Sequence, residues 1–412
     1  GAFHRAHQAW FTSQVDTDKA WGITAFTGRS AKAAEELAPQ DGLFTLITRA
    51  EDGDKFEVID SIILAVDGND TEAFNAAITD ESTAIVTLTI TEAGYGMDAA
   101  GHVDTVNPPV ALQRLANALD ARRLENGQPI AVVSCDNMPS NGALLKVAMT
   151  DLFEELGSEA QAWLASEVSF VTTSIDRITP KATEADIDLV KSATGWDDAS
   201  PVITEPFKDW VLEGEFPLGR PAWQNAGARF VDNIEPFENR KLWLLNGSHS
   251  LLAYAGSLRG HETVAEAIND EVCLGWVEGF WNEAVSHLPA AELDLDNYRE
   301  ALLARYRNGR IAHRLAQIAM DGSTKLRVRI APTAKAELAA GRDAQGCAVA
   351  IGAWVEFVIA NQGVVEDSQA ASILSLVTNK PQDLSQQLVA LIDPALSDHQ
   401  SFMDLVLNRV KV

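Results

Sequence analysis

Ala84-Ile-Val-Thr-Leu-Thr-Ile90 is the stretch on which the predicted fold rests, together with its later counterpart Ile130-Ala-Val-Val-Ser-Cys135. Both are short runs of apolar and β-branched residues, which is typical of strands buried on both faces of a sheet. A long helical pattern, residues 110–126, lies between them. Because parallel strands need a crossover of this length, the order strand, helix, strand predicts two parallel strands joined by a helix.

The same alternation continues in both directions from this unit. Further strand-like runs occur at residues 21–26, 43–48, 56–62 and 168–175. Helical patterns occur at residues 31–38, 143–156 and 159–167. The first part of the chain is therefore predicted to be α/β, with a largely parallel sheet.

The second part of the chain is predicted to be mostly helical. Beyond Lys241, helical patterns recur at residues 251–258, 272–287, 298–306, 334–340 and 348–360. Residues 205–235 are rich in Pro, Gly and Trp, which is typical of an irregular connection. Since 412 residues exceed one ordinary core, we expect an α/β domain over residues 1–185 and a mostly α-helical domain over residues 186–412.

Composition and charge exclude several classes of protein. With 32 Lys and Arg against 59 Asp and Glu, the chain has a net charge of −27 and no prominent basic patch, which argues against a nucleic-acid partner. No apolar run approaches the roughly 20 residues that span a bilayer, and the first residues do not form a signal peptide. A soluble protein without a membrane partner is expected, and small anionic ligands stay compatible with its charge.

The three cysteines, Cys135, Cys273 and Cys347, show neither CxxC nor metal-ligand spacing. This spacing argues against a disulfide framework and a structural zinc, and it fits a reducing cytoplasm. His4 and His7 are one helical turn apart, but no further ligands accompany them. We therefore expect no bound metal.

The run Lys241-Leu-Trp-Leu-Leu-Asn246-Gly-Ser-His249 is the strongest candidate for an active site. On an α-helix, which turns about 100° per residue, Asn246 lies about 140° and His249 about 80° from Lys241, so one broad face carries all three. Hydride transfer from a secondary alcohol requires a base for the hydroxyl proton and donors that stabilise the alkoxide. Lys241 suits the base, Asn246 the alkoxide and His249 the hydroxyl. The alternative is a snorkelling lysine, a solvated amide and a buried structural histidine.

Three further features are candidates for binding. Asp136 and Asn137 directly follow a buried strand, where open α/β sheets bind ligands, although a turn that caps a helix explains them equally well. Asp176 and Arg177 form either an ion pair that pins the floor of an active site or a weak surface pair. Gly1 precedes a predicted helix, whose N-terminus is suited to a pyrophosphate.

These stretches resemble the polyol-specific long-chain dehydrogenases, the family of mannitol 2-dehydrogenase, fructuronate reductase and tagaturonate reductase. The resemblance covers almost the whole chain, with ordered matches at residues 1–8, 87–95, 134–138, 175–180, 205–210, 219–221, 236–238, 241–249 and 321–325. It implies a metal-independent oxidoreductase with an N-terminal Rossmann-type domain and a mostly α-helical C-terminal domain.

The resemblance also implies a role for each matching residue. Lys241 is the general base, Asn246 stabilises the oxyanion, His249 positions the substrate, and Glu238 assists proton exchange with solvent. The implied substrate contacts are Thr172, Asp176, Arg177, Gln317 and Lys325. The implied cofactor contacts are Gly1, Phe3, His4, Arg5, Thr91, Glu92 and Asn137.

Two departures from the family pattern bear on the substrate, a sugar acid or a polyol. Thr172 stands where many mannitol dehydrogenases have an asparagine, and Gln317 stands where an arginine is expected in the mannitol-active branch. The chain therefore looks closer to fructuronate reductase, and the expected reaction interconverts D-fructuronate and D-mannonate. The alternatives are a mannitol 2-dehydrogenase, acting on fructose and mannitol, and a sugar-binding relative without a cofactor.

Two further departures bear on the cofactor, which the resemblance implies to be NAD. Residues 21–30 contain no acid for the ribose hydroxyls, and Arg29 could accept a 2′-phosphate, so NADP is the alternative. Relatives have a strand and a Gly-x-Gly turn ahead of Phe-His-Arg, so the first Rossmann strand is expected to be missing from this sequence. The oligomeric state stays open between monomer and dimer.

Overall fold

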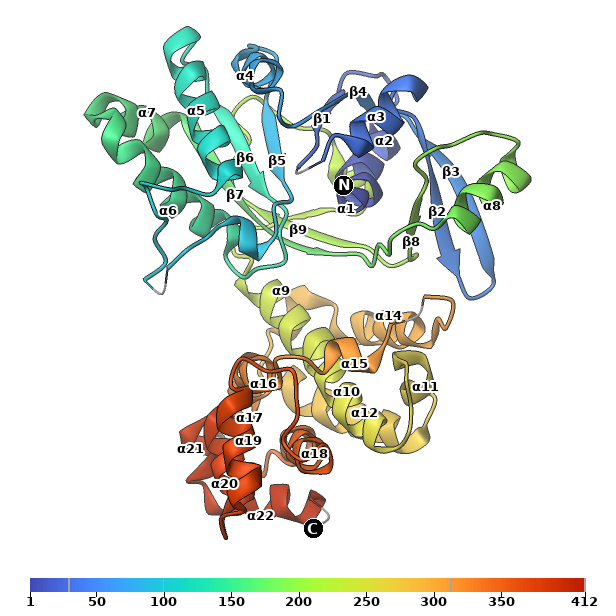
Figure 1. Ribbon diagram of the computed structural model, residues 1–412, viewed down its shortest axis with the longest axis vertical. Coiled ribbons are helices and arrows are strands. Elements are labelled where there is room, and N and C mark those ends of the chain that lie inside the picture. Colours follow the sequence, from blue (N-terminus) through green and yellow to red (C-terminus); the bar gives the residue numbers. More distant parts are fainter. Residues whose placement is uncertain (29, 99, 312, 411–412) are drawn as a thin grey trace. The chain divides into compact units, whose positions relative to one another are not determined.

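The structure is a computed structural model that describes residues 1–28, 30–98, 100–311 and 313–410. The chain divides into two compact units, Gly1–Glu235 and Pro236–Val412 (Figure 1). The division falls at the end of the predicted connection rather than at residue 185, because later strands pair with earlier ones inside the first unit. No helix in the described ranges is long and apolar enough to cross a membrane.

The N-terminal unit contains a five-stranded sheet in the order β10-β9-β7-β6-β5. Its strands are β5 (Ile85–Leu88), β6 (Ile130–Ser134), β7 (Val168–Asp176), β9 (Asp209–Glu213) and β10 (Arg229–Phe230). β5, β6 and β7 are parallel, which confirms the crossover predicted from the two apolar runs. The side chains of Ile130 and Val133 have no exposed surface, as expected for a strand that is covered on both faces.

Successive side chains of β6 point to opposite faces of the sheet and pack in two different hydrophobic cores. Ile130 and Val132 pack with residues of four helices, α4 (Thr71–Thr79), α5 (Val110–Glu125), α6 (Asn141–Phe153) and α7 (Ser158–Glu167). Ala131 and Val133 pack with the N-terminal helical segment, which comprises α1 (Ala2–His4), a π-helix (Arg5–Ala9) and α2 (Trp10–Val15). Helices therefore cover both faces of the sheet, as in a doubly wound α/β fold.

Two smaller sheets complete this unit. One is the parallel pair of β1 (Ile23–Phe26) and β4 (Ile62–Val66). The other has the order β3-β2-β8 and comprises β2 (Phe44–Ala50), β3 (Gly53–Ile59) and β8 (Val202–Thr204). The strand-like run at residues 56–62 is thus divided between β3 and β4, and the helical run at 31–38 contains α3 (Lys32–Leu37).

Parallel pairings join β1 to β4 and, separately, β5, β6 and β7 to one another. β1 and β5 lie near one another in Figure 1 and contribute Ala25 and Ile85 to the same core. Among the described strands, β1 pairs with β4 alone and β5 with β6 alone.

The prediction that residues 205–235 are irregular was wrong in part. β9 pairs antiparallel with β7, so that Thr172 lies opposite Glu213 and Asp176 opposite Asp209. Trp210, Val211 and Leu212 of β9 are all buried. Only three consecutive apolar residues mark this strand, and the flanking Pro and Gly residues concealed it, because a short run gives no clear periodicity.

The C-terminal unit is almost entirely helical, as predicted. It begins with α9 (Glu235–Arg240), a second π-helix (Lys241–Gly247) and α10 (Ser248–Leu258), which form one continuous helical stretch. The remaining helices are α11 (Val264–Ile268), α12 (Glu271–Val285), α13 (Ala290–Leu293), α14 (Leu295–Arg307), α15 (Leu315–Ile318), α16 (Gly322–Arg329), α17 (Ala331–Ala339), α18 (Gln345–Ala360), α19 (Ala370–Asn379), α20 (Leu384–Ile392), α21 (Pro394–Ser397) and α22 (Gln400–Arg409).

Glycines set the packing at the start of α10. A Cβ on Gly247 would lie 2.7 Å from the Phe280 ring of α12, closer than carbon atoms approach. A Cβ on Gly346 of α18 would lie 2.6 Å from the backbone nitrogen of the same Phe280. The end of the second π-helix and α18 can therefore approach α12 only because both positions lack a side chain.

Candidate functional site

Lys241 and Asn246 lie on the second π-helix, Lys241–Gly247. The α-helical spacing predicted for this run was therefore wrong. In an α-helix these two residues would lie about 140° apart around the axis. In a π-helix residue i bonds to residue i+5, so positions 241 and 246 are about one wide turn apart and share a side of the helix. Both side chains are half-buried.

His249 follows in the first turn of α10 and is buried. Its ring lies 4.9 Å from the ring of Tyr306 and 4.8 Å, edge-on, from that of His313. Burial, and then the positive charges of His313, Arg305 and Arg329, lower the pKa of His249 well below 6.5. The imidazole is therefore neutral near pH 7, with one nitrogen able to donate and the other to accept a hydrogen bond.

The other predicted residues of this unit lie on neighbouring segments. Glu238 is half-buried on α9, three residues before Lys241. Lys325 of α16 donates to the carbonyl of Ile318 over 3.1 Å, and burial, followed by the charge of Arg329, lowers its pKa. Gln317 is exposed on α15. The unit thus carries three predicted basic groups, at 241, 249 and 325, in partly or fully buried surroundings.

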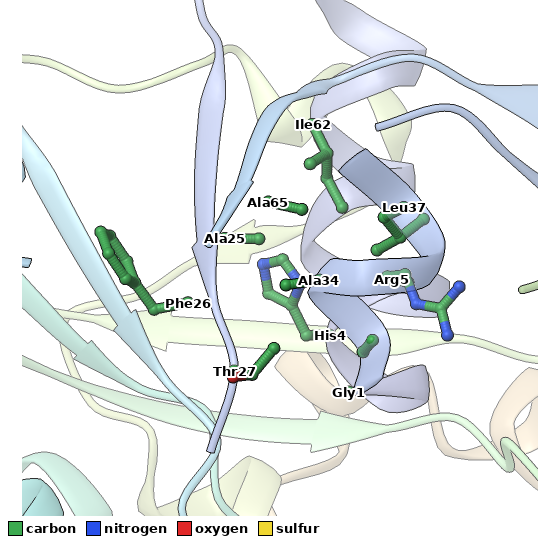
Figure 2. A pocket seen from close by; sticks show the side chains of 11 residues that line it. Gly1, His4, Arg5, Ala25, Phe26, Thr27, Ala34, Leu37, Ile62 and Ala65 are labelled. Carbon is green, nitrogen blue, oxygen red and sulfur yellow. The ribbon is translucent and has the colours of Figure 1, made fainter. Parts of the chain in front are cut away.

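Gly1, His4 and Arg5 line a small pocket in the N-terminal unit (Figure 2). The other lining residues come from β1, α3 and β4 and the positions beside them; they are Ala25, Phe26, Thr27, Ala33, Ala34, Leu37, Ile62 and Ala65. Figure 2 shows the His4 ring between the helix and β1, while Arg5 points away from β1. The lining is mostly small and apolar.

The four predicted cofactor contacts at the start of the chain have different surroundings. Burial, and to a smaller extent the charge of Arg5, lower the pKa of His4 to about 3, so its ring is neutral. Arg5 donates to the carbonyl of Ser200 and lies over the ring of Phe44, which ties the helix to distant segments. Phe3 stacks on His7 with ring centroids 5.4 Å apart.

Asp136 organises the loops at the carboxyl ends of β5 and β6. Its buried carboxylate accepts hydrogen bonds from the backbone nitrogens of Ile90 and Thr91, at 3.2 and 2.7 Å, and from the Tyr95 hydroxyl. Burial raises its pKa. Asp136 thus joins two loops rather than capping a helix, whereas Asn137, Thr91 and Glu92 are exposed at the same edge of the sheet, where α/β proteins bind ligands.

The adjacent positions of Asp176 and Arg177 suggested an ion pair, but Arg177 bonds to other residues. It is buried, donates to the carbonyls of Ala6 and Glu205, and lies 5.0 Å over the ring of Trp10. Arg177 therefore holds the N-terminal helix against the end of β7. Thr172 lies in the middle of β7, where a Cβ on Gly142 of α6 would meet its Oγ1 at 2.6 Å.

Sequence reasoning missed the side chains that surround the lysine-bearing turn. Trp281, Tyr306 and Arg329 donate hydrogen bonds to its carbonyl groups, and His313 lies against His249. They belong to other helices or to the loop before α15, 37 or more residues away along the chain. No local pattern could have indicated them, because periodicity reports only what happens within one element.

His261, Asp270 and Cys273 form a group of metal-ligand type, with ligand atoms within 4.8 Å of one another. However, Asp270 caps α12 through the Val272 nitrogen and accepts from Arg259 Nε over 2.5 Å. The guanidinium of Arg259 already neutralises the negative charge of Asp270, which a bound cation would otherwise neutralise. We therefore interpret this group as a helix cap and assign no metal to it.

Comparison with known proteins places the chain in a family. The family model described as the mannitol dehydrogenase Rossmann domain matches residues 1–225, and that of the mannitol dehydrogenase C-terminal domain matches residues 233–411. D-mannonate oxidoreductase of Escherichia coli (strain K12) is 34% identical over 411 residues, covering 94% of this chain and 84% of the relative.

Two solved structures are also similar over both units. Pseudomonas fluorescens mannitol 2-dehydrogenase, in a ternary complex with NAD and D-mannitol, has a TM-score of 0.77 and 30% identity, covering 99% of this chain and 92% of that one. A D-sorbitol dehydrogenase in substrate-free form has a TM-score of 0.90 and 28% identity, covering 99% and 90%. These matches confirm the resemblance: the chain belongs to the mannitol dehydrogenase family, with its Rossmann domain followed by its helical C-terminal domain.

Proposed function

We propose that this chain is an NAD-dependent oxidoreductase that interconverts a secondary alcohol and a ketone in an open-chain sugar acid, with D-mannonate and D-fructuronate as the preferred pair. The observation that carries the proposal is the wide turn that brings Lys241 and Asn246 to one side of a helix, directly ahead of the buried His249. The similarity to D-mannonate oxidoreductase supports the same chemistry.

The three side chains divide the work of alcohol oxidation. Lys241, in its uncharged form, takes the proton of the substrate hydroxyl. Asn246 donates from its amide to the oxygen as negative charge develops there. His249, which is neutral, holds a hydroxyl group of the substrate. Glu238, three residues before Lys241, passes the proton from the lysine to solvent.

The charges around His249 favour a sugar acid over an uncharged polyol. Arg305 and Arg329 both place positive charge near His249. Lys325 of the neighbouring α16 adds another basic group, which we propose as a substrate contact. In a chain with a net charge of −27, such a local concentration of cations attracts a carboxylate more strongly than a neutral hydroxyl chain.

The N-terminal unit fits a dinucleotide at the carboxyl ends of β1 and β5. The helix that starts at Ala2 offers its N-terminus to a pyrophosphate, and small residues such as Ala25 and Ala33 leave space beside it. When bound, the nicotinamide accepts or supplies the hydride.

Turnover measurements test the substrate and the cofactor together. The full-length protein is mixed with NADH and fructuronate, then with fructose, while the absorbance of the reduced cofactor is followed. Faster turnover of fructuronate is the expected result. A preference for fructose would establish a mannitol 2-dehydrogenase instead, and faster turnover with NADPH would replace NAD by NADP.

A relative that binds sugars without catalysis is the remaining alternative. It predicts calorimetric binding of mannonate with no affinity for NADH or NADPH. Turnover of neither sugar with either cofactor, together with such binding, would overturn the proposed function.

A further inference from the structure

Three side chains, the buried Trp281 and Tyr306 and the half-buried Arg329, converge on the carbonyl groups of the π-helix that carries Lys241 and Asn246. Trp281 Nε1 donates to the carbonyl of Leu244 over 2.8 Å, and the Tyr306 hydroxyl donates to that of Leu245 over 3.1 Å. Arg329 Nη1 lies 3.3 Å from the carbonyl of Asn246. The donors come from three different helices, α12, α14 and α16. Three successive carbonyls of the wide turn thus each have a side-chain partner.

A π-turn is rare because the α-helical arrangement of the same residues is normally preferred. Side-chain donors stabilise the wider turn, since a carbonyl oxygen has two lone pairs and can accept a second hydrogen bond. Ser248 Oγ strengthens the arrangement, because it bonds to the carbonyl of Leu245 and lies 2.8 Å from the Tyr306 hydroxyl. The turn is therefore held from outside its own helix.

Tyr306 and Arg329 also connect the turn to the residues that follow it. The ring of Tyr306, whose hydroxyl bonds to Leu245, packs against His249 at 4.9 Å. Arg329 Nη1, which contacts the Asn246 carbonyl, also donates to Ser250 Oγ over 3.1 Å. The same side chains therefore relate the position of Asn246 to that of His249.

We propose that Trp281, Tyr306 and Arg329 are positioning residues, which hold the π-turn so that Lys241, Asn246 and His249 act together on one substrate. This inference rests on the proposed function of the three residues. The donors do not touch the reacting atoms in this scheme. They act by keeping the amine and the amide about one wide turn apart, closer around the helix axis than the roughly 140° of an α-helix.

The test removes one hydrogen bond at a time. Tyr306→Phe loses the hydroxyl and keeps the ring beside His249, and Trp281→Phe loses the indole donor. Because a displacement of about 1 Å in an active site can lower a rate by about 100-fold, we expect kcat to fall between about 10-fold and 100-fold in each variant. KM is expected to change less than twofold, since substrate contacts are kept.

Trp163→Phe is the matched control. Trp163 of α7 donates from its indole nitrogen to the carbonyl of Gly127 over 2.9 Å, in the other unit. Its loss removes the same type of hydrogen bond without touching the π-turn, so kcat is expected to stay at the wild-type value. A purely structural role of Trp281 would lower the melting temperature and leave kcat of the folded protein unchanged, which would overturn the proposal.

Amide hydrogen exchange provides a readout that does not depend on activity. In Tyr306→Phe and Trp281→Phe, exchange is expected to rise over residues 241–250 and to stay unchanged in Trp163→Phe. Unchanged exchange in this segment would overturn the positioning role even if the wild type showed no turnover. Turnover by the wild type with no loss in the variants would likewise overturn it while leaving the proposed function standing.

Discussion

The described part of the chain contains two π-helices, Arg5–Ala9 and Lys241–Gly247, and their surroundings differ. Both have carbonyls bound by side chains from elsewhere: Arg177 and Ser61 bond to those of Ala6 and Ala9 in the first. All five residues of the first π-helix are buried, whereas the second leaves Lys241 and Asn246 half-buried. The same backbone geometry therefore fixes a helix against a sheet in one unit and presents polar side chains in the other.

The Lys241→Ala substitution tests the chemical role proposed for the second π-helix. Of the changes considered, it is expected to have the largest effect. Loss of a general base lowers kcat by about 100- to 10,000-fold. Folding is expected to be kept, because the side chain is half-buried on the helix surface. The measurement is kcat for mannonate oxidation, with and without added primary amines, which should restore part of the rate. Lys335→Ala, which removes an ion pair with Asp393, serves as the control. An unchanged kcat in Lys241→Ala would refute the role of Lys241 as the general base.

The Arg177→Met substitution tests the structural role of the first π-helix. The buried carbonyls of Ala6 and Glu205 would lose their guanidinium partner, and each unsatisfied group costs about 1–3 kcal/mol. We expect the free energy of unfolding to fall by about 2 to 6 kcal/mol, measured by urea unfolding with hydrogen exchange of residues 2–15. Arg314→Met, which removes an exposed pair with Glu262 at 3.6 Å, should cost under about 1 kcal/mol. Equal losses in both variants would contradict this interpretation.

Gly247→Ala sharpens the comparison at the end of the second π-helix. The added Cβ would lie 2.7 Å from the Phe280 ring, and overpacking of this kind costs about 1–3 kcal/mol. Gly275→Ala in α12 is the control, because nothing lies within 4 Å of its Cβ position and alanine favours the helix. Thermal unfolding is expected to shift down in the first variant and slightly up in the second. A neutral Gly247→Ala would mean that α12 can move away.

The pH dependence of stability reports on His249 and has the smallest expected effect. Its folded pKa lies well below 6.5, so the unfolded chain binds the proton first as the pH falls. Stability is therefore kept above about pH 6.5 and decreases below it, by about 1.4 kcal/mol per pH unit for this one proton. In His249→Asn, the free energy of unfolding measured in urea should depend less steeply on pH between pH 5 and 6.5. Identical slopes would show that His249 takes up no proton on unfolding.

Much of the fold could be predicted because it follows from local patterns. The apolar runs that became β5 and β6 are continuous because helices cover both faces of the sheet. The helical half was predictable because each long helix repeats its apolar residues within a few turns. β9 was not, since only three buried residues mark it and its partner, β7, lies more than 30 residues earlier.

The candidate site divides in the same way. The amino-acid sequence determined that an amine, an amide and an imidazole follow one another in a single helical run. The tertiary structure alone decided that the run winds as a π-helix, because that geometry depends on donors from α12, α14 and α16. It also decided that Arg177 bonds to distant carbonyls rather than to its neighbour. Local periodicity reflects which face of an element is buried, whereas hydrogen-bond partners on other elements become neighbours only when the chain has folded.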